Sequence, residues 1–491
     1  MANSVTTGPP SLPLGSRAAR GAATLLTLRL GLWTLSLAQN VVVARTIVPR
    51  ELGLYAMALA IVTLSVRLKQ LGSAEKLIRD PDEELRTAFG AATVVEVGVG
   101  IVAMIVLAAG ALLIPWAGAE PRARVVIAAL SVLMLQSASD LPVALFHRRL
   151  EFRRLALRRA LEGLLVVAAT IAAAVGGLQV WALVVGQLVG VVAAALLFWR
   201  GVDPPPRLAF ESSSIRAYLS FGLPLWGSGL LYALAERGSI LVVSSVLGLS
   251  TLGYVHLAQA LLLRLNQGND AANAAIYPAL RALVDKPNAL RAVLERTIRV
   301  FALAGVVCGV ALALFAGEWV PKFFGAAWSP AIPFVSVYCL TWGFSAIGYP
   351  CYLAFQVRGD TRTVFTFGAS GFLARFVVIA AGVVWLGELG LLIGIASTAA
   401  INIAAREAMI RRMFPDFSLL RLSAGSVLVA SCALGAERLV HLFSSTASGP
   451  VRLAVFAAAA AGAAALFDRA TVGDAAAQVR GAIHGLSSAP S

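Results

Sequence analysis

Arginine side chains inside long apolar segments are the residues of this chain best placed to do chemistry. Arg29, Arg237, Arg264 and Arg375 lie inside such segments, and Arg67 lies near the end of another. An arginine at the centre of a membrane helix costs about 2.5 to 3.5 kcal/mol on insertion scales, so it normally faces a partner or a polar cavity. Its guanidinium stays charged and forms paired hydrogen bonds with phosphate. These arginines are therefore candidate contacts for an anionic ligand.

The alternative is that the arginines are structural and pair with buried acids or extend to the membrane surface. Glu96, Asp140 and Glu162 lie in apolar segments and are candidate partners across helices. Glu236 directly precedes Arg237 and points about 100° away around a helix, which disfavours a direct ion pair between them.

Polar side chains recur within two helical turns of one further segment. Gln267, Asn269, Asp270 and Asn273 could hydrogen-bond the hydroxyl groups of a ligand, although solvated residues at a helix end would give the same pattern. His256 and Glu236 are candidate groups for coupling to protons or cations. For His256, the alternative is a histidine that is hydrogen-bonded inside a helix bundle.

Signals for catalysis or for a cofactor are missing from the sequence. There is no GxxxxGK[ST] loop, which disfavours direct use of ATP. The four histidines are scattered, and the four cysteines occur singly, without metal-ligand or disulfide spacing. We therefore expect no metal, no cofactor and no enzymatic activity.

The elements that must position these residues are membrane helices. The chain has 491 residues, of which 59% are hydrophobic and 13% charged, and its mean hydropathy is +0.83. Apolar runs long enough to cross about 30 Å of hydrocarbon predict an all-α polytopic membrane protein with about 14 transmembrane helices. The predicted helices span residues 22–44, 51–71, 87–114, 125–146, 160–177, 179–199, 217–247, 251–276, 297–316, 331–355, 363–385, 389–410, 420–437 and 452–468.

The positive charge follows the loops of this topology. A net charge of +15 suggests nucleic acid in a soluble protein, but here most of the 40 Lys and Arg residues fall on one side of the predicted membrane. The stretch "HRRLEFRRLALRR" (147–159) is the strongest such signal, and a role in gathering anionic lipid is a further hypothesis for it. The pattern places both termini in the cytoplasm and excludes nucleic acid as a partner.

An internal repeat divides the chain. Residues 40–60 and 240–260 align without a gap at an offset of 200, pairing Gly53 with Gly253, each in a turn between two helices. Chance matching of two apolar helices is the alternative. Parallel repeats with an even number of helices each suit this pattern. The predicted division is a tail (1–21), a six-helix lobe (22–200), a Pro- and Ser-rich linker (201–216), a second six-helix lobe (217–415), helices 13 and 14 (416–468), and a cytoplasmic tail (469–491).

An ordered set of segments resembles a known family. The segments "ARTIVPRELGLYAMALAIV", "RRLEFRRLALRRALEGLLVV", "VWALVVG", "LSFGLPLWGSGLLY", "VLGLSTLGYVHLAQALL", "IYPALRAL" and "FFGAAWSPAIPF" occur in the order expected for Wzx-type polysaccharide and oligosaccharide flippases. These belong to the multidrug/oligosaccharidyl-lipid/polysaccharide exporter superfamily. The likeness runs from about residue 22 to 415.

The resemblance implies two six-helix lobes around a central cavity that opens alternately to either side. It implies transfer of a polyprenyl-diphosphate-linked oligosaccharide to the outer leaflet of a bacterial inner membrane, with membrane lipids, a polysaccharide polymerase and export machinery as partners. Helices 1, 2, 7 and 8 line the cavity in the family, which favours Arg29, Arg237 and Arg264 as diphosphate contacts. Gln267, Asn269 and Asn273 become candidate sugar contacts. Where many relatives have an acid, this chain has Ser239 and Gln70, which puts a cation-coupling acid in doubt.

Three other functions compete with this interpretation. A drug/cation antiporter of the same superfamily commonly uses an acid in helix 1, and none lies in residues 22–44. A membrane enzyme of glycan assembly usually has a large outward loop, whereas the longest predicted here are the short segments 317–330 and 438–451. A membrane scaffold would not need the intramembrane arginines, which are costly to insert.

Overall fold

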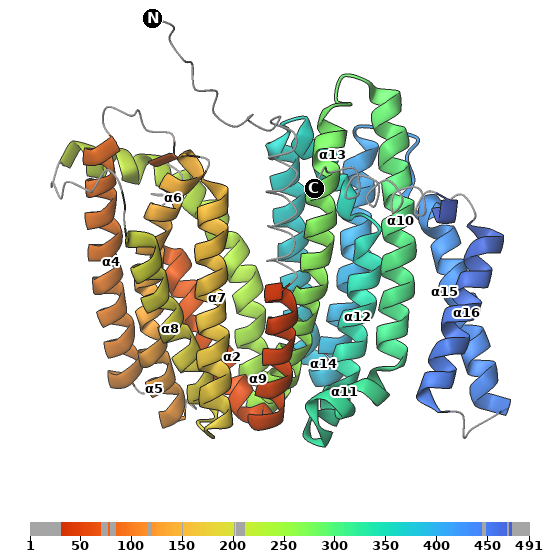
Figure 1. Ribbon diagram of the computed structural model, residues 1–491, viewed down its shortest axis with the longest axis horizontal. Helices are drawn as coiled ribbons and strands as arrows, with labels where there is room; N and C mark the ends of the chain where they lie inside the picture. The colour runs from red at the N-terminus through yellow and green to blue at the C-terminus, as the bar shows by residue number, and fades with distance from the viewer. Residues whose placement is uncertain are drawn as a thin grey trace, which may run out of the picture.

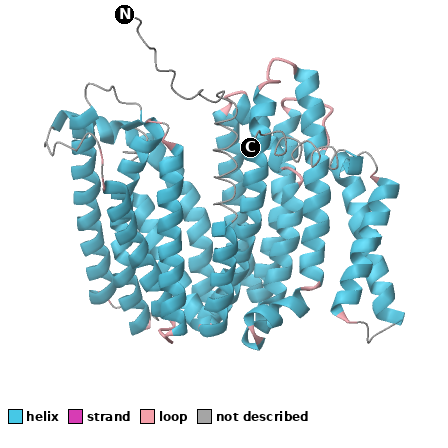
Figure 2. Ribbon diagram, viewed as in Figure 1, coloured by secondary structure: helices cyan, strands magenta, loops and turns pink. Residues whose placement is uncertain are grey.

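The chain forms helices throughout its described part. The computed structural model describes residues 31–69, 77–78, 85–114, 120–149, 151–200, 202, 212–443, 448–468 and 471–473, with the side chains of 86, 212–232, 271, 274–275 and 361 excepted. Within these ranges every regular element is a helix and none is a strand (Figure 2). The prediction of an all-α polytopic membrane protein is confirmed, while Arg29 and most of the two predicted tails lie outside the described residues.

A first group of helices comes from residues 31–200 and is coloured red to yellow in Figure 1. Residues 31–46 are helical. The other elements of the group are α2 (Pro49–Lys69), α4 (Leu85–Leu113), α5 (Pro121–Leu130), η2 (Ser131–Ser139), α6 (Asp140–Arg148), α7 (Phe152–Val175) and α8 (Val180–Trp199). The span from Pro121 to Arg148 is irregular because its central nine residues, η2, form a 3₁₀-helix, a conformation that rarely exceeds about four residues.

A second group is built from residues 212–411. Its elements are α9 (Ser212–Arg281), α10 (Pro287–Leu314), α11 (Ala316–Phe324), η3 (Ala326–Ala331), α12 (Ile332–Ala346), α13 (Tyr349–Val357) and α14 (Thr361–Arg411). The two longest are broken where a glycine has positive φ: Gly248 in α9 (φ 84°) and Gly387 in α14 (φ 62°). Both breaks fall between helices that the sequence predicts as separate, at 247/251 and 385/389.

The last two helices form a pair beside the second group (Figure 1). They are α15 (Leu419–Phe443) and α16 (Gly449–Phe467), and they pack on α10 around Phe315 and Phe456. Arg452 of α16 donates to the buried Glu437 of α15 (2.7 Å) and to Glu318 of α11 (3.0 Å). These contacts of Arg452 link α15 and α16 to the end of the bundle that holds α11, which we call the α11 end.

The described residues contain nine helices long and apolar enough to cross a membrane, or ten if the bent pair α12–α13 counts as one span. Broken helices such as α9 and α14 count once in that number. The protein is therefore a multi-pass membrane protein, and the total of fourteen stays a prediction.

The two groups of helices meet at the α11 end. The largest cluster of buried apolar residues joins Val43 and Leu52 of the first group to Leu252, Trp328 and Val335 of the second. In Figure 1 the two groups converge at the lower edge and diverge toward the end that holds α6 and α13, which we call the α13 end.

Candidate functional site

The polar residues of α9 lie on its second half, after the break at Gly248. Arg264 is partly buried, its Nη1 lies 3.4 Å from Oε1 of Gln267, and its Nε is buried without a hydrogen-bond partner. Its backbone carbonyl accepts a hydrogen bond from Nε1 of Trp33 (2.9 Å), which places Arg264 against the first helix of the other group. No carboxylate of the described residues forms an ion pair with Arg264. This arginine is a charged donor at the contact between the groups.

Asp270 and Asn273 continue the same stretch of α9. Asp270 is exposed and accepts a hydrogen bond from the hydroxyl of Tyr349 in α13 (2.6 Å). Asn273 is only 7% exposed, and its Oδ1 has no partner among the described residues. Asn269 is partly buried. The structure thus brings Arg264, Gln267, Asp270 and Asn273 together on one helix, with donors and acceptors left for a ligand.

Arg237 lies on the first half of α9 and differs from Arg264. Its Nη2 is 4.0 Å from Oε1 of Glu236, a long contact at the limit of an ion pair. His256 packs edge-on against Tyr55 of α2, with ring centroids 6.1 Å apart, and Tyr55 accepts a hydrogen bond from Gln187 (2.8 Å). A coupling role for Glu236 or His256 stays a prediction.

Two other candidate arginines lie away from this cluster. Arg375 of α14 stacks on Phe372, with the guanidinium carbon 4.8 Å from the ring centre. Arg67 is exposed near the end of α2. The substrate roles of Arg375 and Arg67 stay predictions.

The acids expected to neutralise the arginines have other partners. Glu162 and Asp140 both lie near Arg159 of α7, at 2.9 and 3.9 Å. Glu96 binds Lys69 instead, with Nζ and Oε2 3.2 Å apart. The structure therefore describes ion pairs of these acids with Lys69 and Arg159, and pairing with the candidate arginines stays a prediction.

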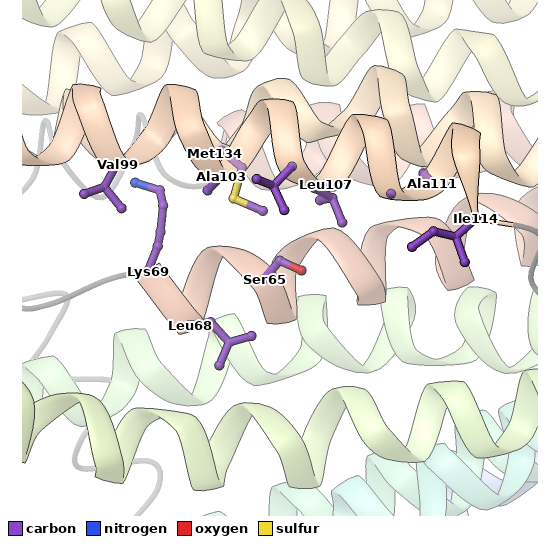
Figure 3. Close-up of a pocket in the computed structure, with 11 residues that line it drawn as sticks. Ser65, Leu68, Lys69, Val99, Ala103, Leu107, Ala111, Ile114 and Met134 are labelled. Carbon is purple, nitrogen blue, oxygen red and sulfur yellow. The ribbon is translucent and has the colours of Figure 1, made fainter.

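The Lys69 and Glu96 pair is a buried polar site that the sequence did not reveal. Both side chains are less than 8% exposed, and Ser137 of η2 donates to Glu96 (2.9 Å) and also contacts Lys69. From Lys69 a groove of about 710 Å³ runs between α2 and α4, lined mainly by apolar residues such as Val99, Leu107 and Ile114 (Figure 3). Lys69 lies at the end of a predicted helix, where a flanking cation is expected, so no local signal in the sequence indicates its pairing with Glu96.

Three contacts join the groups of helices at the α11 end. Arg45 donates from Nε and Nη2 to the carbonyls of Phe323 and Lys322 (both 2.7 Å), at the C-terminus of α11. The buried Trp328 donates from Nε1 to the carbonyl of Ala44 (2.5 Å). Gly53 and Gly253 pack backbone to backbone. This end of the protein is closed by contacts between the two groups.

Comparison with solved structures defines the class of this fold. The chain is similar to the lipid II flippase MurJ in an inward closed conformation, with a TM-score of 0.72, 12% identity, and coverage of 92% of this chain and 100% of that one. It is also similar to an inward-facing multidrug resistance MATE family transporter of the MOP superfamily, with a TM-score of 0.57, 14% identity, and coverage of 81% and 100%. The fold is that of these transporters.

Sequence comparison then gives the family. Residues 42–333 match the family described as polysaccharide biosynthesis protein. The chain is 24% identical over 379 residues to the lipopolysaccharide biosynthesis protein WzxC of Escherichia coli (strain K12), covering 75% of each chain. It is 25% identical over 215 residues to the succinoglycan biosynthesis transport protein ExoT of Rhizobium meliloti (strain 1021), covering 43% of each chain. The chain belongs to the polysaccharide biosynthesis protein family, and the resemblance seen in the sequence is confirmed.

Proposed function

We propose that this protein is a flippase that moves a polyprenyl-diphosphate-linked oligosaccharide from the cytoplasmic to the outer leaflet of a bacterial inner membrane. The family match and the names of the relatives WzxC and ExoT support a role in polysaccharide assembly. The two-lobe fold shared with MurJ supports transport by alternating access. The α11 end faces outward and the termini lie in the cytoplasm, as the charge pattern predicts.

One observation carries this proposal. Arg264 is a partly buried cation without a carboxylate partner among the described residues, and it lies where α9 meets the first helix of the other lobe. A guanidinium in this setting replaces the hydration that a diphosphate loses between the lobes. Gln267 and Asn273, close by on α9, supply hydrogen bonds for sugar hydroxyls.

The membrane potential contributes to the direction of transport. Two negative charges that move outward across an inside-negative potential of roughly 100 mV release up to about 4.6 kcal/mol. A substrate with a diphosphate therefore needs no acidic coupling residue, in keeping with Ser239 and Gln70 at positions where many relatives of the resembled family have an acid. A polysaccharide polymerase and export machinery act next on the delivered glycan.

A drug/cation antiporter is the second candidate, because the MATE transporter shares the fold. Mass spectrometry of lipids that copurify with the protein separates the two. The proposal requires a polyprenyl-linked glycan, enriched over the lipids that copurify with an unrelated multi-pass protein from the same membranes. Recovery of small organic cations without such a lipid would favour the antiporter.

A further inference from the structure

The helix formed by α12 and α13 is broken inside the C-terminal lobe. α12 ends at Ala346, α13 begins at Tyr349, and the two axes differ by 40°. Pro350 has no N–H to offer the carbonyl of Ala346 four residues earlier, which explains why the chain breaks here. A break leaves carbonyl groups at the end of α12 without helical partners, and in a membrane such groups must be satisfied by other residues.

Arg406 of α14 reaches into this break. Its Nη1 donates to the carbonyl of Ser345, and Asn402, one turn earlier on α14, lies 3.4 Å from the hydroxyl of the same serine. The guanidinium carbon lies 5.6 Å from the ring centre of Tyr349 and 5.2 Å from that of Tyr352. Arg406 therefore occupies the inner side of the bend.

The backbone of the break is shaped to receive this arginine. A Cβ placed on Gly348 would lie 3.1 Å from Cβ and 3.3 Å from Cγ of Arg406, which is tighter than ordinary packing. A side chain at position 348 would thus push Arg406 out of the bend.

Arg406 is a buried cation without a carboxylate partner in the described part of the chain. It is 7% exposed, and its Nε has no hydrogen-bond partner. The neighbouring Glu407 is engaged elsewhere, by Arg411 (2.6 Å) and by the backbone N–H of Leu419 (2.6 Å). Burying an unpaired charge costs free energy, so an apolar residue at position 406 would pack between α12 and α14 at a lower cost.

The bend directs α13 onto the polar stretch of α9. The hydroxyl of Tyr349, the first residue of α13, donates to Asp270 (2.6 Å). At the other end of α13, Arg281 of α9 donates to the carbonyl of Val357 (2.8 Å). α13 is therefore linked to α9 at both ends, and one of the links reaches the polar stretch that contains Gln267 and Asn273.

We propose that Arg406 is a positioning residue that holds the α12–α13 helix bent, and that the Tyr349–Asp270 hydrogen bond couples this bend to occupancy of the polar stretch of α9. The inference rests on the proposed function, because it takes that stretch as the contact for substrate hydroxyl groups. A hydroxyl that binds Asp270 competes with the hydroxyl of Tyr349. Substrate binding then releases α13 from α9 while Arg406 keeps the bend in place.

Amide hydrogen exchange of residues 349–357 in lipid nanodiscs tests the coupling without any transport assay. Tyr349→Phe and Asp270→Ala should each speed exchange in α13 by about tenfold, the effect of losing a hydrogen bond to a charged group. The double variant should exchange no faster than the single ones, because both remove the same bond. Unchanged exchange in Tyr349→Phe, or independent effects that multiply in the double variant, would overturn the coupling.

Substitutions of Arg406 test the positioning role. Arg406→Gln should speed exchange at residues 345–357 and lower glycan export at least tenfold at matched protein levels. Arg406→Lys should recover part of both, because lysine still donates to the Ser345 carbonyl. Arg412→Gln is the matched control, since Arg412 is an exposed residue of the same region that stacks on Phe367 (4.7 Å). Wild-type exchange and export in Arg406→Gln would overturn the role.

The two proposals fail in different ways. If Arg406→Gln does not accumulate in membranes, Tyr349→Phe, which removes one hydroxyl, decides the coupling alone. Absence of glycan export by the wild-type protein would contradict the proposed function but leave the exchange results standing. Wild-type export with no exchange response in the variants would contradict only the inference.

Discussion

Gly53 and Gly253, equivalent positions of the internal repeat, lie against each other at the α11 end. A Cβ placed on Gly53 would lie 2.9 Å from the backbone nitrogen of Gly253, and one placed on Gly253 would lie 3.2 Å from the nitrogen of Gly53. Each added Cβ would also overlap a carbonyl, of Leu249 or of Pro49. The two segments thus meet at this end of the protein by direct backbone contact, which no side chain larger than hydrogen permits.

The first prediction concerns this contact. Gly53→Ala or Gly253→Ala should separate the lobes at the α11 end and lower export several-fold, because the backbone carbonyls cannot move aside. The measurement is export at equal membrane levels of protein. Gly98→Ala is the control, since a Cβ there meets no atom within 4 Å. Normal export in both alanine variants would show that the close contact is dispensable.

The second prediction concerns Trp328, which joins the lobes through its hydrogen bond to Ala44. Trp328→Phe should favour opening at the α11 end, because it removes a bond worth about 0.5 to 1.5 kcal/mol. A cysteine at Val43, which is 6% exposed, should then react faster with a membrane-impermeant thiol reagent added outside, in a background without native cysteines. Trp385→Phe, at a residue that is 80% exposed, should leave the rate unchanged. An unchanged rate in Trp328→Phe would contradict the prediction.

The third prediction concerns the buried pair of Lys69 and Glu96. Lys69→Met should lower the free energy of unfolding by about 3 to 5 kcal/mol, because it leaves the carboxylate of Glu96 buried without its cation. Lys69→Met with Glu96→Met should be much closer to wild type. Unfolding of the purified protein in a mixed detergent and denaturant series measures the change.

The exposed pair of Arg122 and Glu51, 3.3 Å apart, is the control for that experiment. Arg122→Gln should cost no more than about 1 kcal/mol, because the Arg122 side chain is 77% exposed. A Lys69→Met variant as stable as Arg122→Gln would mean that water reaches Glu96 and that the pair is not structurally important.

The sequence predicts the helices well, because apolar length and glycine turns are local signals. The breaks at Gly248 and Gly387 fall between predicted helices, and the predicted polar stretch of α9 does place Arg264 beside Gln267. The repeat at an offset of 200 also pointed to the glycines that meet in the structure.

Partners across helices could not be predicted in this way. Lys69 binds Glu96 because the packing of α2 against α4 decides which long side chains meet, whereas Arg159 and Glu162 pair within α7 at a spacing of three residues. The sequence does not indicate a special role for Arg406, because this residue lies near the end of a predicted helix, where a cytoplasmic cation is expected. The structure shows that Arg406 is buried and packs against Gly348 at the break between α12 and α13.

The most direct test of the proposed function is translocation of a polyprenyl-diphosphate-linked oligosaccharide in proteoliposomes with an imposed inside-negative potential. We expect wild-type protein, and an Arg421→Gln control at an exposed position of α15, to move the glycan to the outer leaflet. Arg264→Gln should be inactive while keeping its level and fold, with partial activity in Arg264→Lys. Wild-type translocation by Arg264→Gln, or no translocation by the wild-type protein, would contradict the account.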